Sequence, residues 1–150
     1  MTDPAAADLF PRCLPTILAM EGGLVDHPSD PGGLTKYGIS QRAYPAEDIR
    51  ALTKARAGEL YRRDYWDVAG CPVLGWPMAL VHFDAAVNHG VRRARRFLAA
   101  APTAEAYLAA RAAFYRALVR RRPASSVFLK GWMNRLRHVA QVGQVAWSPD

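Results

Sequence analysis

The stretch "LAMEGGLVDHPSDPGGLTKYGIS", residues 18–40, places one carboxylate, Glu21, directly before two glycines. Apolar residues precede it at the one, three and four spacing of a helix face: Leu9, Phe10, Cys13, Leu14, Ile17 and Leu18. The glycines end this helix, because glycine adopts the left-handed conformation of a helix C-terminus. A proline is tolerated only in the first turn, so we expect the regular helix to run from about Pro15 to Met20 or Glu21.

The segment that follows, residues 24–39, contains two prolines, a Gly-Gly pair and scattered Asp, Ser and Thr residues. This composition predicts tight turns or a small irregular hairpin. We expect the segment to be exposed but structured.

Helical signals dominate the rest of the chain. They resume briefly at Ser40, break near Pro45, and return over residues 52–66 with Thr53 as a plausible N-cap. Apolar stripes then recur over 78–98, 107–119 and 128–139, and "NHG" at 88–90 separates two helices. No long stretch alternates with period two. The fold class is therefore mainly α, with at most a small β-hairpin or irregular loop near residues 24–39.

Length and composition favour one ordinary globular domain over residues 1–150, with 51% hydrophobic and 22% charged residues. Cys13 and Cys71 are too few for a disulfide framework and are expected to be buried or idle thiols. The four histidines show no metal-ligand spacing, so we expect no metal and no cofactor. No apolar run is long enough to span a membrane, and the N-terminus lacks the pattern of a secretory signal. We therefore expect a protein made in the cytoplasm.

The charge is distributed unevenly. Residues 1–75 hold 8 Lys and Arg against 10 Asp and Glu, net −2, whereas residues 76–150 hold 12 against 3, net +9. The runs "RRARR" at 92–96 and "RRR" at 120–122 permit three interpretations: solvated helix faces, attraction to anionic cell-envelope polymers or lipids, or nucleic-acid binding. Because no recognised nucleic-acid-reading motif is present, specific nucleic-acid binding ranks last.

Glu21 is the first candidate for chemistry. A carboxylate at a helix C-terminus faces the negative end of the helix dipole and holds its proton more tightly when partly desolvated. Such a group can act as the general acid in glycosidic bond cleavage, which also needs a second group for the water or the developing cation. Asp30 and Thr35 lie in the following loop, and Asp26 competes with them. The alternative is that Glu21 is a solvated helix end and that Asp30 merely starts a turn.

Several segments together resemble glycoside hydrolase family 108, the muramidases of the phage endolysin and secretion-activator group. The resemblance begins with "EGG" followed by "HPSDPGGLTKYGIS" and continues through "LYRRDYWD" at 60–67, "FDAAVNHG" at 83–90 and "FYRAL…FLKGWMNRL" at 114–136. It extends from about residue 9 to 141.

This resemblance implies a lysozyme-like helical domain whose residues 9–75 form a catalytic half. The basic residues 76–150 are similar to the family's peptidoglycan-binding region. Glu21 matches the glutamate of the family's Glu-Gly-Gly motif, which implies that it is the general acid. The spacing to Asp30 and Thr35 is also similar to that of phage lysozymes, which makes both residues candidates for placing the attacking water and leaves inversion or retention open.

Three further residues are candidates for binding the sugar. The rings of Tyr37 and Trp66 could offer flat faces to a pyranose, whereas most other aromatics are expected in the core. Asn88 is either a helix cap or an amide donor to an N-acetyl group.

The expected function is a cofactor-free N-acetylmuramidase that cleaves peptidoglycan between N-acetylmuramic acid and N-acetylglucosamine. The resemblance places such an enzyme in a phage, prophage or gene-transfer particle, or in a secretion-activator role. It would be a monomer that reaches the wall through a holin or another export route. The alternative is a catalytically silent wall-binding or phage structural module. Two departures motivate that alternative: Leu24 replaces the family's usual aromatic residue, and the segment after Leu98 lacks a characteristic turn.

Overall fold

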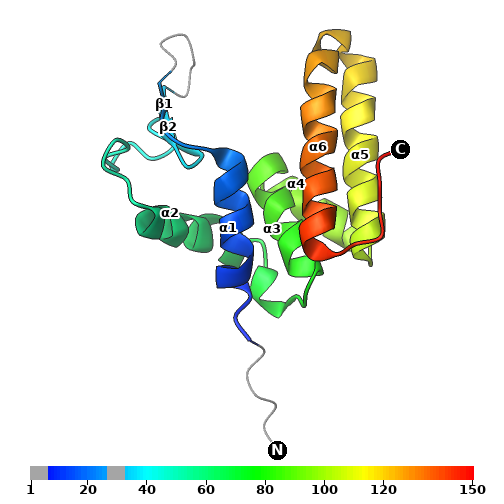
Figure 1. Ribbon diagram of the computed structural model, residues 1–150, viewed down its shortest axis with the longest axis horizontal. Helices are drawn as coiled ribbons and strands as arrows, with labels where there is room; N and C mark the ends of the chain where they lie inside the picture. Colours follow the sequence, from blue (N-terminus) through cyan, green and yellow to red (C-terminus); the bar gives the residue numbers. More distant parts are fainter. Residues whose placement is uncertain (1–6, 27–32) are drawn as a thin grey trace, which may run out of the picture.

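Helix α1 (Phe10–Glu21) lies in the middle of the molecule in the computed structural model, which describes residues 7–26 and 33–150. A small sheet and α2 lie on one side of it, and the antiparallel pair α5 and α6 stands on the other (Figure 1). The core runs between them and centres on α3, most of whose residues are buried. The prediction of a mainly α fold is confirmed.

Helix α1 begins earlier than the sequence predicted. Its N-terminus is at Phe10, with Pro11 in the first turn, but Pro15 lies inside the helix. Pro15 is exposed, so the missing backbone N–H is on the solvent side. Phe10, Cys13 and Ile17 are buried on the opposite side, and this burial outweighs the lost hydrogen bond.

Gly22 ends α1 with a φ of +79°, as predicted. The chain then forms a three-stranded antiparallel sheet of β1 (Val25–Asp26), β2 (Leu34–Lys36) and β3 (Ile39–Ser40). In this sheet Thr35 pairs with Val25 on one side and with Ser40 on the other. The predicted small hairpin is therefore confirmed, with one further short strand.

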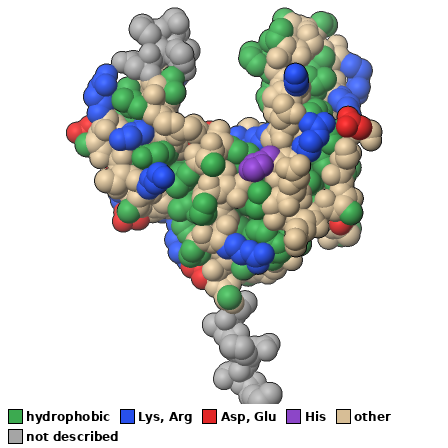
Figure 2. All heavy atoms as spheres, viewed as in Figure 1, with side chains coloured by type: hydrophobic (Ala, Val, Ile, Leu, Met, Phe, Trp, Pro, Cys, Tyr) green, Lys and Arg blue, Asp and Glu red, His purple; other side chains and the backbone are tan. Residues whose placement is uncertain are grey.

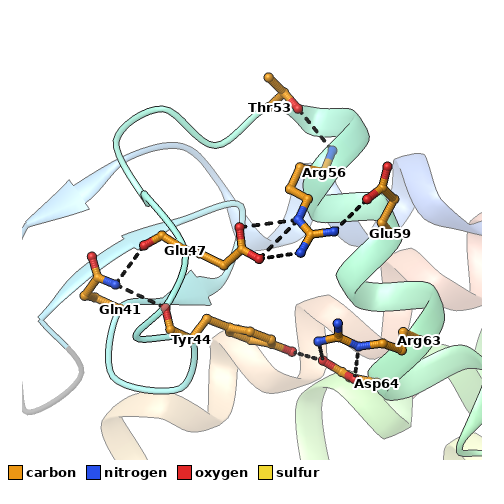
Figure 3. A network of polar contacts seen from close by, with 8 residues as sticks. All are labelled: Gln41, Tyr44, Glu47, Thr53, Arg56, Glu59, Arg63 and Asp64. Carbon is orange, nitrogen blue, oxygen red and sulfur yellow. Dashed lines mark hydrogen bonds and ion pairs between the residues drawn. The ribbon is translucent and has the colours of Figure 1, made fainter.

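The segment between β3 and α2 contains turns where a brief helical signal was predicted, and polar contacts fix it in place (Figure 3). Gln41 Nε2 donates to the carbonyls of Tyr44 and Glu47 at 3.1 and 2.9 Å. The Glu47 carboxylate accepts from Arg56 Nη2 at 2.5 Å. Thr53 is the predicted N-cap, because its hydroxyl accepts from the Arg56 backbone N–H at 3.1 Å. These contacts hold the segment against α2 (Lys54–Tyr61).

The remaining elements follow the predicted stripes closely. They are the π-helical turn η1 (Arg62–Asp67), the 3-10 turn η2 (Cys71–Val73), α3 (Met78–His89), α4 (Val91–Ala100), α5 (Ala104–Arg121), the 3-10 turn η3 (Pro123–Ser125) and α6 (Ser126–Gly143). Gly90, with a φ of +87°, separates α3 from α4 as the "NHG" signal indicated.

Both cysteines are free and buried, as expected. Burial raises the pKa of both the Cys13 and the Cys71 thiol to about 12, so neither is a thiolate near neutral pH.

Over residues 7–26 and 33–150, no three His, Cys, Asp or Glu side chains gather in a way that could hold a metal ion. No helix in this part of the chain has the length and apolar character needed to cross a bilayer.

Candidate functional site

A notch separates the part of the molecule that contains the strands and α2 from the α5–α6 pair, and basic side chains and a histidine lie at its base (Figure 2). A groove of about 500 Å³ opens between α1, α3 and α6. Its lining residues are Met20, Asn88, Gly131, Trp132, Asn134, Arg135 and His138. Most of them are polar or aromatic, as in sites that bind sugars.

Glu21 lies at the C-terminal end of α1. It contacts Arg135, which is one of the residues that line this groove. Its Oε1 accepts a hydrogen bond from Arg135 Nη1 at 2.8 Å, across a sequence separation of 114 residues. The Glu21 side chain is 23% exposed and that of Arg135 is 14% exposed. The predicted acid is therefore partly desolvated, but its partner is a cation from the other end of the chain.

The turn between β2 and β3 packs directly against Glu21. A Cβ added at Gly38 would lie 2.9 Å from Glu21 Cβ and 2.5 Å from the Tyr61 hydroxyl oxygen. Gly38 has a φ of +78°, and the Tyr61 hydroxyl donates to the carbonyl of Tyr37 at 2.5 Å. Only glycine allows this close approach, which fixes the hairpin against the acid.

Arg135 also binds a buried ion pair. Its Nη2 lies 2.9 Å from Asp84 Oδ1, and Arg111 Nη2 lies 2.7 Å from Asp84 Oδ2. Asp84 and Arg111 are fully buried. Burial alone would raise the pKa of Asp84, but Arg111 and Arg135 hold it below its ordinary value. We name Glu21, Asp84, Arg111 and Arg135 the charge cluster.

His89 extends the charge cluster on the side of α5. Its Nε2 accepts from Arg111 Nε at 3.0 Å. Burial and the adjacent Arg111 lower the pKa of His89 to about 3, so it stays neutral in the physiological range. It therefore holds Arg111 in place without adding charge.

Thr35 lies on β2, and Tyr37 lies in the turn between β2 and β3 that packs against Glu21. The Thr35 side chain is half-buried on β2. Tyr37 has a φ of +52° and lines a second, apolar groove of about 520 Å³ along the far side of α1, with Leu14, Pro15 and Leu18. Leu18 and Met20 point to opposite sides of α1, so Tyr37 does not line the groove that contains Arg135.

Asn88, predicted as either a helix cap or an amide donor, lies in the last turn of α3 and lines the groove with Arg135. Its Oδ1 accepts from the Tyr115 hydroxyl, and its amide N–H groups are the donors that a bound sugar could use. Asp30 lies outside the described residues.

Trp66, by contrast, is 1% exposed. Its ring packs against Phe10 and Phe83 in the core, with centroids 5.4 and 5.2 Å away, and borders a pocket beside Asp8 and Arg62. It offers no open face to a sugar in the groove.

Sequence reasoning missed Trp132 and Arg135. Trp132 was assigned to the core stripe of its helix, but it lines the groove and stacks on Tyr115 at 4.8 Å between ring centroids. Arg135 is one arginine among many in a basic half. The sequence did contain one indication of its importance: Arg135 interrupts an otherwise apolar face of its helix. A cation in that position needs a partner of opposite charge in the core.

Comparison with known proteins identifies relatives. The profile of the family described as glycosyl hydrolase 108 matches residues 14–90, just over half of the 150-residue chain. The structure of SagA from Brucella abortus is similar, with a TM-score of 0.74 and 27% sequence identity, over 97% of this chain and 98% of that chain. No curated protein matches the sequence.

Proposed function

Because the chain belongs to the glycosyl hydrolase 108 family, and is thus a glycoside hydrolase that acts on peptidoglycan, we propose that it is an N-acetylmuramidase with Glu21 as its general acid. The bond cleaved is the one between N-acetylmuramic acid and N-acetylglucosamine. Membership of the family alone specifies neither which glycosidic bond is cleaved nor which residue donates the proton.

The observation that supports the role of Glu21 is its position beside the groove. Its side chain is partly buried, its Cβ and Cγ pack against the turn at Gly38, and its carboxylate contacts Arg135 in the groove wall. A general acid must sit within hydrogen-bond reach of the leaving oxygen in a site that limits water. Glu21 meets the second requirement, and a glycan strand in the groove would meet the first.

In the proposed reaction Glu21 donates its proton to the glycosidic oxygen as the bond to the sugar carbon breaks. A water molecule then attacks the resulting oxocarbenium-like centre and gives up one proton, either to the ionised Glu21 if the configuration is retained or to a second carboxylate if it is inverted. We retain Asp30 and Thr35 as the groups that orient this water. The position of Thr35 supports this, since it lies on β2, the strand that leads into the turn packed against Glu21. Asn88, and Trp132 in place of Trp66, are the proposed sugar contacts in the groove.

The test is mass spectrometry of soluble fragments released from purified sacculi by the wild type and by Glu21→Gln. Glu59→Gln is the matched control, because Glu59 is exposed on α2 and pairs with Arg56. We expect fragments with reducing-end N-acetylmuramic acid from the wild type and the control. Glu21→Gln should be slower by about a hundredfold or more. Equal fragment release by Glu21→Gln would exclude Glu21 as the acid, and reducing-end N-acetylglucosamine would exclude a muramidase.

We further propose that the enzyme acts on the wall after release through a holin or another export route, as an endolysin or a secretion activator. The support is the resemblance of its motifs to those groups. Co-expression with and without a holin tests it: lysis should require both the holin and Glu21.

A further inference from the structure

We propose that Arg135 is an exchange site for a carboxylate of the substrate: an anionic group of the glycan strand replaces Glu21 on Arg135 and thereby frees Glu21 to take up the proton that it donates. The inference rests on the proposed function of Glu21. It deepens that function by specifying that the productive substrate has a carboxylate next to the cleaved linkage.

The first argument is the charge balance of the cluster. Two carboxylates, Glu21 and Asp84, face two guanidinium groups, Arg111 and Arg135. The contacts in this set range from 2.7 to 3.0 Å, and Asp84 and Arg111 are fully buried. His89 is neutral and therefore does not change the net charge of the cluster. The ligand-free cluster is therefore electrically neutral.

Protonation of Glu21 disturbs this balance. An ion pair with arginine favours the ionised form of a carboxylate, whereas a general acid must be protonated before it can act. Once Glu21 is protonated, the cluster has an excess positive charge in a largely buried position, which is unfavourable. A second carboxylate on Arg135 restores neutrality.

The second argument is geometric. Arg135 Nε donates to Asp84 Oδ1 at 3.0 Å, and Nη2 lies 2.9 Å from the same oxygen. Nη1, by contrast, donates to Glu21 Oε1 at 2.8 Å. The same residue lines the 500 Å³ groove. A ligand in the groove can therefore compete for Nη1 while Asp84 retains the other side of the guanidinium. Asp84 and Arg111 thus act as positioning residues that keep Arg135 in place during the exchange.

Among the residues that the structure describes, the other titratable groups that face Glu21 do not supply this second carboxylate. Tyr61 and Tyr65 face it from α2 and η1, and burial, together with the charge of Glu21, raises the pKa of both phenols. They stay neutral at physiological pH. Asp84 faces it through Arg135 from α3 and is already paired with two arginines. Over residues 7–26 and 33–150, the carboxylates that contact Arg135 are Glu21 and Asp84, so the proposal takes the additional carboxylate from the ligand.

Peptidoglycan offers two sources of such a carboxylate. The lactyl group of muramic acid has one when no peptide is attached, and the stem peptide has others. Three probes distinguish them: a glycan tetrasaccharide with free lactyl carboxylates, the same tetrasaccharide with stem peptides, and neutral chitotetraose.

The decisive experiment is calorimetric binding of these probes to Glu21→Gln and to the wild type. Glu21→Gln removes the internal competitor for Arg135, so we expect its Kd for the responsible carboxylate-bearing probe to fall by about tenfold. The Kd for chitotetraose should not change. An equal gain for all three probes, or no gain for either anionic probe, would overturn the proposal.

Variants of the arginine complete the test. In Arg135→Gln the preference for anionic over neutral probes should disappear. In Arg137→Gln it should persist, because Arg137 is an exposed cation on the same helix that contacts Asn134 and Asp150. Melting temperatures show which variants are still folded. Arg135→Lys retains the positive charge, so it should retain at least part of the preference for anionic over neutral probes. A preference that survives in folded Arg135→Gln contradicts the proposal.

This binding readout is independent of catalysis. If the wild type releases no fragments from sacculi, the proposed function fails, while the binding data still decide whether Arg135 selects carboxylates.

Discussion

At Gly38 the site has no space for a side chain. Its φ is +78°, and a Cβ there would collide with both Glu21 and Tyr61. We predict that Gly38→Ala lowers the rate of sacculus digestion by about a hundredfold, because a shift of about 1 Å in a catalytic group has an effect of that size.

Gly33→Ala is the matched control for this prediction. Gly33 also has a positive φ, +67°, but an added Cβ meets nothing within 4 Å. Both variants introduce backbone strain of about 1–2 kcal/mol, so only Gly38→Ala should lose activity beyond its loss of stability. Equal activity losses in the two variants would show that strain, and not the contact with Glu21, is responsible.

His89 makes the fold sensitive to acid. Its pKa is lowered to about 3 by burial and Arg111, whereas the unfolded chain has an ordinary histidine pKa near 6.5. The unfolded state therefore binds more protons below about pH 6.5, so the stability provided by neutral His89 is complete above that pH and falls as the pH drops towards 3. We predict that urea denaturation shows a loss of stability from pH 7 to pH 5. His89→Gln, which retains an acceptor for Arg111, should weaken this dependence, and an unchanged slope would refute the assignment.

At the scale of the elements, helix α1 lacks one backbone hydrogen bond, and the effect of this loss on stability can be measured. Pro15 lies inside the helix on its exposed side and cannot donate to the carbonyl one turn earlier. We predict that Pro15→Ala raises the free energy of unfolding by about 1 kcal/mol, since the restored hydrogen bond exceeds the entropy that proline removes from the unfolded chain. Pro11→Ala, in the first turn, should leave stability almost unchanged. Thermal denaturation of both variants measures the difference.

The sequence predicted most elements well and their ends less well. Apolar spacing located α3, α5 and α6, and Gly22, Thr53 and Gly90 marked boundaries correctly because each has a local chemical cause. The start of α1 was predicted too late, since burial of Phe10 overrides the local cost of Pro15. The turns after Ser40 depend on contacts of Gln41 and Glu47 with other segments, which no local pattern reveals.

For the molecule as a whole, the basic C-terminal half predicts binding that depends on salt. Residues 106–149 contain no Asp or Glu, and Arg120, Arg121 and Arg122 are exposed at the end of α5. We predict that raising NaCl from about 50 to about 300 mM weakens the binding of Glu21→Gln to sacculi several-fold, as screening requires. Replacing the three arginines by glutamine should reduce this salt dependence, and cosedimentation measures both. Binding that is indifferent to salt would exclude an electrostatic role for this half.

The candidate site shows where sequence reasoning ends. Glu21 and Asn88 became candidates because each occurs in a distinctive local motif. In the structure Glu21 contacts Arg135, and Asn88 lines the same groove as Arg135. Arg135 itself could not be identified, because its significance comes from Asp84 and Glu21, which are far from it in sequence. Trp66 was misjudged because nothing in its local sequence distinguishes an aromatic that faces a groove from one that fills the core.

The bond between Glu21 and Arg135 also limits how such enzymes can be recombined. A chimera that joined residues 1–75 to the C-terminal half of a relative would exchange the partner of Glu21, the proposed acid, along with the basic surface of that half. A truncated protein without α6 would leave Glu21 and Asp84 with one arginine fewer. The two halves therefore have to be kept together, and engineered enzymes based on this chain should take α1, α3 and α6 from the same parent.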